Sequence, residues 1–235
     1  MAYEFEFAAT LEYSDLLLKG AAMTLGLTAI GGIFGISLGT LGAVSRAWKI
    51  HPFDWLFTGY VELIRNTPFL VQLFFIFFGL PAIGIQMGEW NAAVLAMIIN
   101  LGAYSTEIIR AGIEATPKGQ IEAAQSLAFS RAETFRYVVL RPALQRVWPA
   151  LTSQVIIVML GSAVCSQIAA EELTFAANFI QSRNFRAFET YFITTAMYFI
   201  MAIGIRQLLI FIGNTWVVKR PRKSPVSQTV VSNHA

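Results

Sequence analysis

The sequence predicts an all-helical integral membrane protein with five transmembrane helices. Hydrophobic residues make up 56% of its 235 residues and charged residues only 13%, whereas soluble domains are typically about 25% charged. The charged residues gather between long apolar stretches, each close to the roughly 20 residues that cross a bilayer as a helix. Composition and pattern together exclude a water-soluble globular protein.

Five charge-poor stretches define the predicted spans. We place them at about 16–45, 68–86, 90–112, 147–169 and 188–218. They form a single transmembrane domain over residues 1–218. Residues 219–235 have no helical period and no apolar face, so we expect a disordered tail there.

The stretch before the second span has a different character. Residues 52–65 carry Asp54, Glu62 and Arg65 among aromatic residues. Charges are costly in hydrocarbon but not at the headgroup level, so we expect this segment to lie as a helix at the membrane interface. Pro68 would then start the second span.

The basic residues predict the orientation of the chain. Twelve of the 17 Lys and Arg residues follow the first, third and fifth spans, and only three lie on the other side. Loops rich in Lys and Arg stay in the cytoplasm. We therefore expect the N-terminus outside and the C-terminal tail and the loop 114–146 in the cytoplasm. This distribution also explains the basic excess without a nucleic-acid partner.

A stripe of small residues marks the first span. Gly31, Gly35 and Gly39 recur at four-residue intervals. Such a stripe lets another helix approach closely inside a membrane. The spacing is the same for a helix of this chain and for one of a second subunit, so both interpretations stay open.

The cytoplasmic loop contains a short predicted helix over about 117–129. Pro117 suits a helix start, and Glu122 lies where a carboxylate complements the positive end of the helix dipole. Ala123 and Ala124 give the helix a small-residue surface. This pattern fits a groove on another protein, or a helix that lies on the bilayer.

Three motifs, taken in order, resemble a known family. They are Lys118-Gly119-Gln120 followed by Glu122-Ala123-Ala124, the segment YVELIRNTPFLVQ at 60–72, and the segment AYSTEIIRAGI at 103–113. The first is similar to the EAA loop of ABC importer permeases. All three together resemble the polar amino acid uptake branch, the histidine/glutamine/glutamate type. The resemblance covers roughly residues 15–218.

The resemblance implies a fold, partners and a location. We expect the type I ABC importer permease fold, in a bacterial inner membrane. Residues 118–120 and 122–124 would dock on a cytoplasmic ATPase subunit that binds ATP and Mg²⁺. A second permease subunit, identical or different, an extracytoplasmic binding protein, membrane lipid and an amino acid substrate complete the expected partners.

No catalytic residue, cofactor site or metal site is expected in this chain. It contains no G-x-x-x-x-G-K-[ST] phosphate-binding sequence, so ATP hydrolysis is expected elsewhere. Two departures from the family pattern affect the loop. Ala128 stands where the family usually has Gly, and Pro142 is displaced by one position, in Leu140-Arg141-Pro142. We therefore expect a differently shaped turn after the short helix.

Ionisable residues near the spans are candidates for a gate or for structural ion pairs. Glu62 and Arg65 are three residues apart, and so are Glu107 and Arg110. This spacing places opposite charges on one helix face. Charges in a span are costly unless they are paired or face water.

Polar residues in the spans suggest a substrate path. The candidates are Gln72, Asn100, Tyr104, Gln154, Ser162, Ser166 and Arg206. Arg206 lies about 18 Å from the predicted cytoplasmic end of its span and has no acidic partner in its own helix. A substrate carboxylate or a glutamate on another helix would supply the counter-charge. Interhelical hydrogen bonding is the alternative role for the polar residues of the fourth span.

Outside the membrane, Glu171 and Glu172 precede the last span, with Arg183 and Arg186 nearer to it. Mixed charge on a short loop fits contact with a binding protein or a solvated loop.

A self-contained ion-coupled carrier or channel is the rival class. Carriers of that kind often contain two related halves, whereas five spans do not divide equally and the sequence shows no internal repeat.

Overall fold

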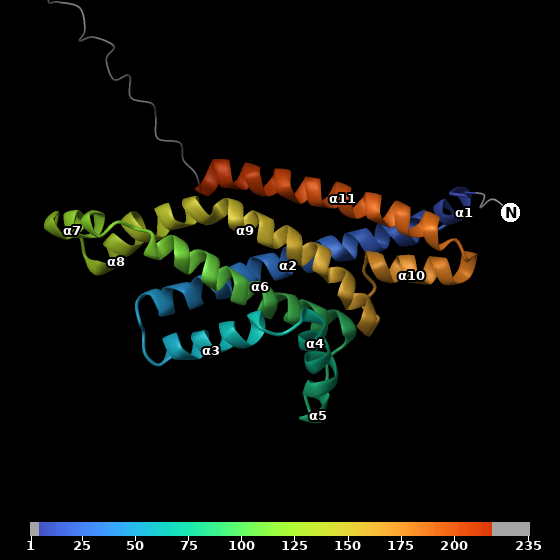
Figure 1. The fold of residues 1–235 in the computed structure, drawn as a ribbon, viewed down its shortest axis with the longest axis horizontal. Helices are drawn as coiled ribbons and strands as arrows, with labels where there is room; N and C mark the ends of the chain where they lie inside the picture. Colours follow the sequence, from blue (N-terminus) through green and yellow to red (C-terminus); the bar gives the residue numbers. More distant parts are fainter. Residues whose placement is uncertain (1–4, 218–235) are drawn as a thin grey trace, which may run out of the picture.

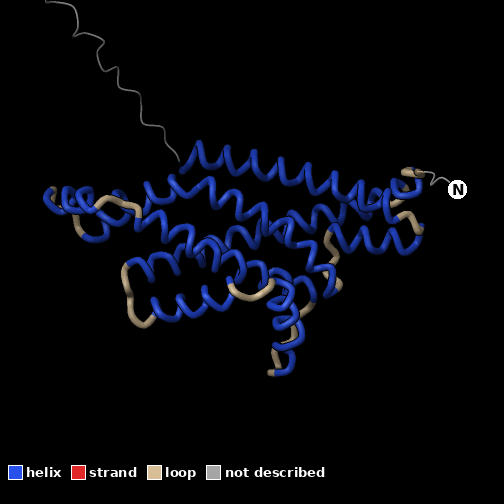
Figure 2. Tube along the Cα trace, in the orientation of Figure 1, coloured by secondary structure: helices blue, strands red, loops and turns tan. Residues whose placement is uncertain are grey.

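The computed structural model describes residues 5–217, and Figure 2 shows helices joined by short loops along this part of the chain. Four helical runs are long and apolar enough to cross a membrane. They are α2 (Ser14–Ala47), α6 (Glu89–Glu114), Arg131–Ile168 with α9 (Arg141–Gly161), and Ala187–Thr215 with α11 (Ala187–Ile212). They extend along the long axis of the molecule (Figure 1) and overlap the first, third, fourth and fifth predicted spans.

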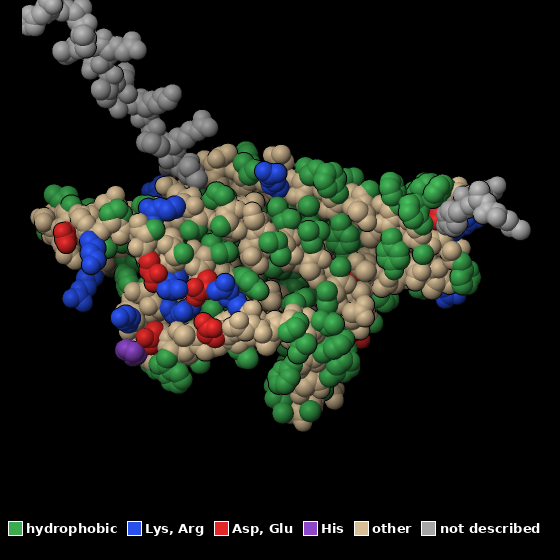
Figure 3. All heavy atoms as spheres, viewed as in Figure 1, with side chains coloured by type: hydrophobic (Ala, Val, Ile, Leu, Met, Phe, Trp, Pro, Cys, Tyr) green, Lys and Arg blue, Asp and Glu red, His purple; other side chains and the backbone are tan. Residues whose placement is uncertain are grey.

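The remaining crossing is broken into two parts. α3 (Phe53–Arg65) is followed by α4 (Phe69–Phe74), which continues through a π-helical turn into α5 (Leu80–Ala82). The two parts meet at an angle of 111° and count together as a fifth candidate span. Figure 1 shows α4 and α5 turning away from the long helices, and Figure 3 shows that much of their surface is hydrophobic.

α3 packs one face against α2 and α6 and leaves most of its other side chains exposed. Val61 and Ile64 are buried and pack near Ala103 of α6. The hydroxyl of Tyr60 donates a hydrogen bond to the carbonyl of Ile99, 2.5 Å away. α3 therefore has an apolar side that packs on α6. The number of charged residues in the segment does not indicate where that side lies.

Close packing of α2 on α6 forms the centre of the fold. The glycine stripe of α2 faces Met97, Leu101 and Ser105 of α6. A Cβ atom at Gly39 would collide with the Ser105 side chain and lie 3.0 Å from the carbonyl oxygen of Gly102. The stripe therefore serves packing within this chain.

Short helices occupy the two ends of the bundle. α7 (Lys118–Ser126) and α8 (Arg131–Glu133) lie at one end, and α1 (Ala8–Leu11) and α10 (Leu173–Asn184) lie at the other (Figure 1). The tail predicted over residues 219–235 falls outside the described residues.

The segment expected as a charged outer loop is largely folded against the bundle. Glu172 is fully buried, accepting hydrogen bonds from the amide of Phe175, at 2.8 Å, and the hydroxyl of Tyr198, at 2.6 Å. Burial raises the pKa of the Glu172 carboxyl. The neighbouring Glu171 pairs with Lys19 at 2.7 Å. These charges therefore serve contacts within the chain.

Candidate functional site

The helix α7 has one attached face and one exposed face. Ala124 is buried, and Ile121 packs against the hydrophobic cluster that includes Val139 and Phe135. The predicted docking residues Lys118, Gly119, Gln120, Glu122 and Ala123 are exposed, whereas Ala124 holds the helix to its own chain. Such an arrangement presents a rigid helix to a partner.

The turn after α7 adopts the conformation that glycine favours, although the residue is alanine. Ala128 has φ = 59°, in the left-handed region. The amide of Phe129 donates to the carbonyl of Ala124 at 3.1 Å, so the chain closes over the end of the helix. Ala128 thus adopts the left-handed conformation in spite of its Cβ, which makes the conformation costly by roughly 1 kcal/mol.

Glu107 joins three helices near the end of α6 that leads to α7. Its carboxylate pairs with Arg46 of α2, with Arg110 at 2.8 Å, and with Arg65 of α3 at 3.9 Å. Arg110 also contacts Glu114 at 2.7 Å. The predicted Glu107–Arg110 pair thus belongs to a larger network that ties α2 and α3 to α6.

The pair expected between Glu62 and Arg65 does not form within the described residues. The Arg65 guanidinium lies over the ring of Tyr104, 5.5 Å from its centroid, and faces Glu107. The Glu62 carboxylate instead accepts a hydrogen bond from the side-chain amide of Asn66, at 3.1 Å. Helix spacing permits the pair, but Arg65 instead contacts the Tyr104 ring and Glu107.

Gln72 holds the break between α3 and α4 together. Its buried amide nitrogen donates to the carbonyl of Ile64 at 2.7 Å and to the carbonyl of Thr67 at 2.9 Å. These carbonyls lose their helical partners at the break, and an unsatisfied polar group inside a membrane costs several kcal/mol. Gln72 is thus a structural part of the site.

The same glutamine sets the orientation of Asn100. Because the Gln72 nitrogen is already used, its oxygen accepts the hydrogen bond from the Asn100 nitrogen, at 3.0 Å. The Asn100 oxygen consequently remains available as an acceptor. No other residue has a hydrogen bond to it among the described contacts.

A cavity of about 390 Å³ lies at this helix break. It is lined by Thr67, Pro68, Phe69, Asn100, Tyr104, Gln154, Ile157, Val158 and Gly161. Three of the predicted path residues, Asn100, Tyr104 and Gln154, therefore line one cavity. A smaller cavity of about 240 Å³ contains Glu62 and Arg65 and shares Tyr104 with it. Amide and charged groups from α3, α6 and α9 thus line two cavities that meet at Tyr104.

The other predicted path residues lie elsewhere. Ser162 and Ser166 donate hydrogen bonds to carbonyls of their own helical segment, Met159 and Ala163. Arg206 lines a separate groove that includes Ser153. Ser153 directly precedes Gln154, and successive helical residues point about 100° apart, so α9 separates this groove from the amide-lined cavity.

Sequence reasoning missed the contributions of Thr67, Pro68 and Phe69. The signal was present, because a proline after Asn66-Thr67 predicts a helix break. The expected start of the second span at Pro68 agrees with the structure, because α4 begins at the next residue. Arg46 was also missed, since nothing in the local spacing connects it with Glu107.

Comparison with known proteins agrees with this architecture. The family described as "Binding-protein-dependent transport system inner membrane component" matches residues 18–223. The chain belongs to this family. It is thus an inner-membrane permease subunit of an ABC importer, without catalytic activity of its own, and the rival class of self-contained carrier or channel is ruled out.

Individual relatives extend over nearly the whole chain. The arginine transport system permease protein ArtQ of Bacillus subtilis (strain 168) is 31% identical over 93% of this chain and 98% of its own. The glutamine transport system permease protein GlnP of Escherichia coli (strain K12) is 34% identical over 88% and 95%. A crystal structure of an amino acid ABC transporter with histidines has a TM-score of 0.81 and 38% identity, and the match covers 90% of this chain and 99% of that one. The shared fold is therefore the type I ABC importer permease fold.

Replacement of Ala128 by glycine should stabilise the turn after α7. We expect a gain of about 0.5 to 1 kcal/mol, because the left-handed conformation no longer carries the cost of a Cβ atom. Limited trypsin digestion of the full chain at Arg131 should become slower. Ala123→Gly is the control, because the same change inside α7 should speed cleavage. Faster cleavage of Ala128→Gly would contradict the interpretation.

Replacement of Glu107 by glutamine should loosen the contact among α2, α3 and α6. Three guanidinium groups would lose their shared carboxylate, and we expect a loss of about 2 kcal/mol. Thermal unfolding of the purified chain in detergent measures it. Arg65→Gln should have a smaller effect, since its pair is longer and its side chain is 43% exposed. Equal losses of stability in Glu107→Gln and Arg65→Gln would contradict the central role of Glu107 in the ion-pair network.

Proposed function

We propose that this chain moves a polar amino acid into the cell through the cavity at the break between α3 and α4. The observation that carries the proposal is the convergence of Asn100, Tyr104 and Gln154 on a space of about 390 Å³. Relatives that are named as arginine and glutamine permeases support the substrate class. A free amino acid needs both hydrogen-bond acceptors and a positive group, and both are present here.

The hydrogen bonds of the site favour one orientation of the substrate. The Asn100 oxygen is an available acceptor and suits the ammonium group. The Arg65 guanidinium in the adjoining cavity suits the carboxylate. Gln154 has no hydrogen-bond partner among the described residues, so its amide is available to the substrate side chain or backbone.

The energy for transport would come from separate ATPase subunits. In this proposal the exposed face of α7 fits a cleft on the ATPase, which binds ATP and Mg²⁺. A movement of α7 reaches the cavity through α6, because Glu107 lies between Glu114, at the end of α6, and Asn100. The chain itself makes and breaks no covalent bond.

The complete importer would contain two permease subunits around a shared path, identical or different. A binding protein would deliver the amino acid at the end that carries α1 and α10, and the distribution of basic residues favours this end as the outer one. The end that carries α7 would then face the cytoplasm. Membership in a family of binding-protein-dependent transport components supports both external and ATPase partners.

Replacement of Gln154 by leucine should weaken substrate recognition. We expect the KM for uptake to rise about tenfold, because one hydrogen bond to the substrate is lost and the cavity keeps its volume. The measurement is uptake by the complete importer in vesicles, with arginine, glutamine, histidine and cystine tested in turn.

Ser153→Ala is the matched control for Gln154→Leu. Ser153 lies next to Gln154 but lines the groove with Arg206, and its hydroxyl bonds only to the Pro149 carbonyl of its own helix. Its KM should stay within about twofold of the parent, since no substrate contact is lost. A normal KM for Gln154→Leu with a raised KM for Ser153→Ala would contradict the proposal and indicate that the substrate passes along the other face of α9.

Replacement of Glu122 by lysine should abolish docking of the ATPase. The change reverses the charge of an exposed residue on the docking face of α7 without removing a side-chain contact within the chain. Co-purification of the ATPase from detergent measures the effect. Glu12→Lys makes the same change at the opposite end of the bundle and should keep the ATPase bound. Unchanged co-purification in Glu122→Lys would refute α7 as the docking element.

A further inference from the structure

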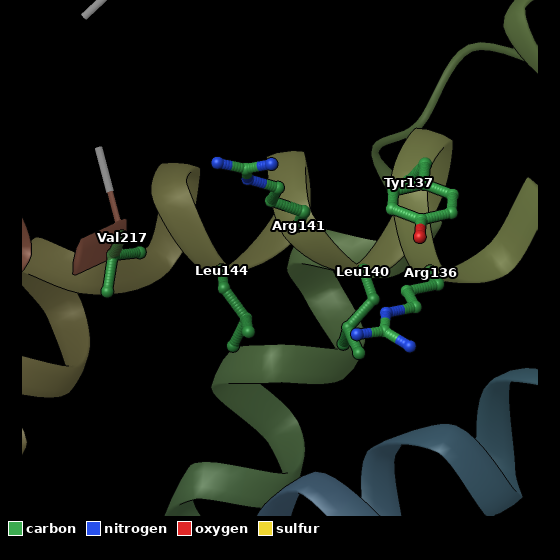
Figure 4. Close-up of a pocket in the computed structure, with 6 residues that line it drawn as sticks. All are labelled: Arg136, Tyr137, Leu140, Arg141, Leu144 and Val217. Atoms are coloured by element: carbon green, nitrogen blue, oxygen red, sulfur yellow. The ribbon is translucent and has the colours of Figure 1, made fainter. Parts of the chain in front are cut away.

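Another cavity lies at the end of the bundle where two spans meet. It has a volume of about 310 Å³ and is lined by Arg136, Tyr137, Leu140, Arg141, Leu144 and Val217 (Figure 4). The first five belong to the π-helical turn Thr134–Leu140 and the start of α9, and Val217 ends the helical run of α11. The amide-lined cavity shares none of these residues.

The two arginines of this cavity have no acidic partner within the described residues. Arg46, Arg65 and Arg110 all pair with Glu107, whereas Arg136 contacts only the ring of Tyr137, 5.6 Å from its centroid. Figure 4 shows the guanidinium groups of Arg136 and Arg141 on opposite sides of the helical segment that carries them. Both side chains are exposed and available to an anion.

The rest of the lining is apolar. Leu140, Leu144 and Val217 supply the apolar part of the lining, and Figure 4 shows Leu140 and Leu144 on the same side of the segment as the Arg136 guanidinium. The side-chain amide of Gln145 donates to the carbonyl of Val217 at 2.7 Å, and this bond fixes the end of α11 against α9. The cavity therefore combines a hydrophobic floor with two cationic edges, and a small free anion would use only the edges.

The cavity lies at the ends of two candidate spans. It lies at the first turns of the span Arg131–Ile168 and just beyond the end of the span Ala187–Thr215. The chain continues after Val217 with Lys219, Arg220, Arg222 and Lys223. Basic clusters directly beyond a transmembrane helix, and basic pockets between such helices, bind anionic lipid headgroups.

We propose that this cavity binds an anionic phospholipid. The Arg136 guanidinium binds the phosphate, the Arg141 guanidinium adds positive charge from the other side of the segment, and the acyl chains lie along Leu140, Leu144 and Val217. Guanidinium forms paired hydrogen bonds with phosphate oxygens, which an ammonium group does not match in geometry. A free phosphate ion shares the headgroup chemistry but leaves the apolar floor uncovered.

Native mass spectrometry of the full chain tests this proposal. The chain is released from mixed micelles that contain equal amounts of phosphatidylglycerol and phosphatidylcholine, and the bound lipids are counted by mass. We expect phosphatidylglycerol to dominate. The double variant Arg136→Gln/Arg141→Gln should lower its excess over phosphatidylcholine about tenfold or more. Added inorganic phosphate should not displace the lipid, and displacement would overturn the proposal in favour of a phosphate site.

Two control variants separate a specific site from general attraction. Arg183→Gln removes one charge at the other end of the bundle, where the side chain contacts the Phe179 ring, and should leave the lipid ratio unchanged. Arg136→Lys/Arg141→Lys keeps the charge and the fold but should still lower the ratio. An unchanged ratio in the lysine variant overturns the proposal. So does a double glutamine variant that binds lipid normally but no longer co-purifies with the ATPase.

Discussion

The close contact between α2 and α6 determines where the functional groups of this chain lie. Glycines at 31, 35 and 39 allow the two backbones to approach, and any larger residue at Gly39 would force them apart. α6 then supplies both Asn100 to the cavity and Glu107 to the ionic network. α3 and α9 pack against the remaining faces of α6. Under the proposed function, recognition and coupling therefore both depend on α6, which the glycines of α2 allow to pack closely.

The amide-lined cavity depends on the break between α3 and α4. A continuous second crossing would satisfy its backbone internally and leave no reason for an amide network at membrane depth. The break exposes the carbonyls of Ile64 and Thr67, Gln72 satisfies them, and Gln72 in turn orients Asn100. The need to satisfy these two carbonyls thus leaves the Asn100 oxygen as a hydrogen-bond acceptor at the cavity wall. The polar residues are consequences of the broken backbone as much as of substrate recognition.

The sequence allowed the helical class, the positions of the long helices and the short helix α7 to be predicted, because each depends on local composition and spacing. It also placed Asn100, Tyr104 and Gln154 in one group. It did not predict that Arg206 lies on the other side of α9 from these three residues. The position of Arg206 along its own helix does not indicate which side of α9 its side chain contacts. The loss of the Glu62–Arg65 pair has a similar origin. The partner of Arg65 depends on residues from other helices, and spacing within one helix does not indicate which of these residues are near.

The broken crossing has a consequence for how the chain enters the membrane. The part from Phe69 to Ala82 is about 21 Å long as a helix, short of the roughly 30 Å of the hydrocarbon core. It also carries Gln72, whose oxygen finds its partner only on α6. We therefore expect the second crossing to settle only after α6 has been synthesised and inserted. The order of membrane insertion would then differ from the order of the sequence.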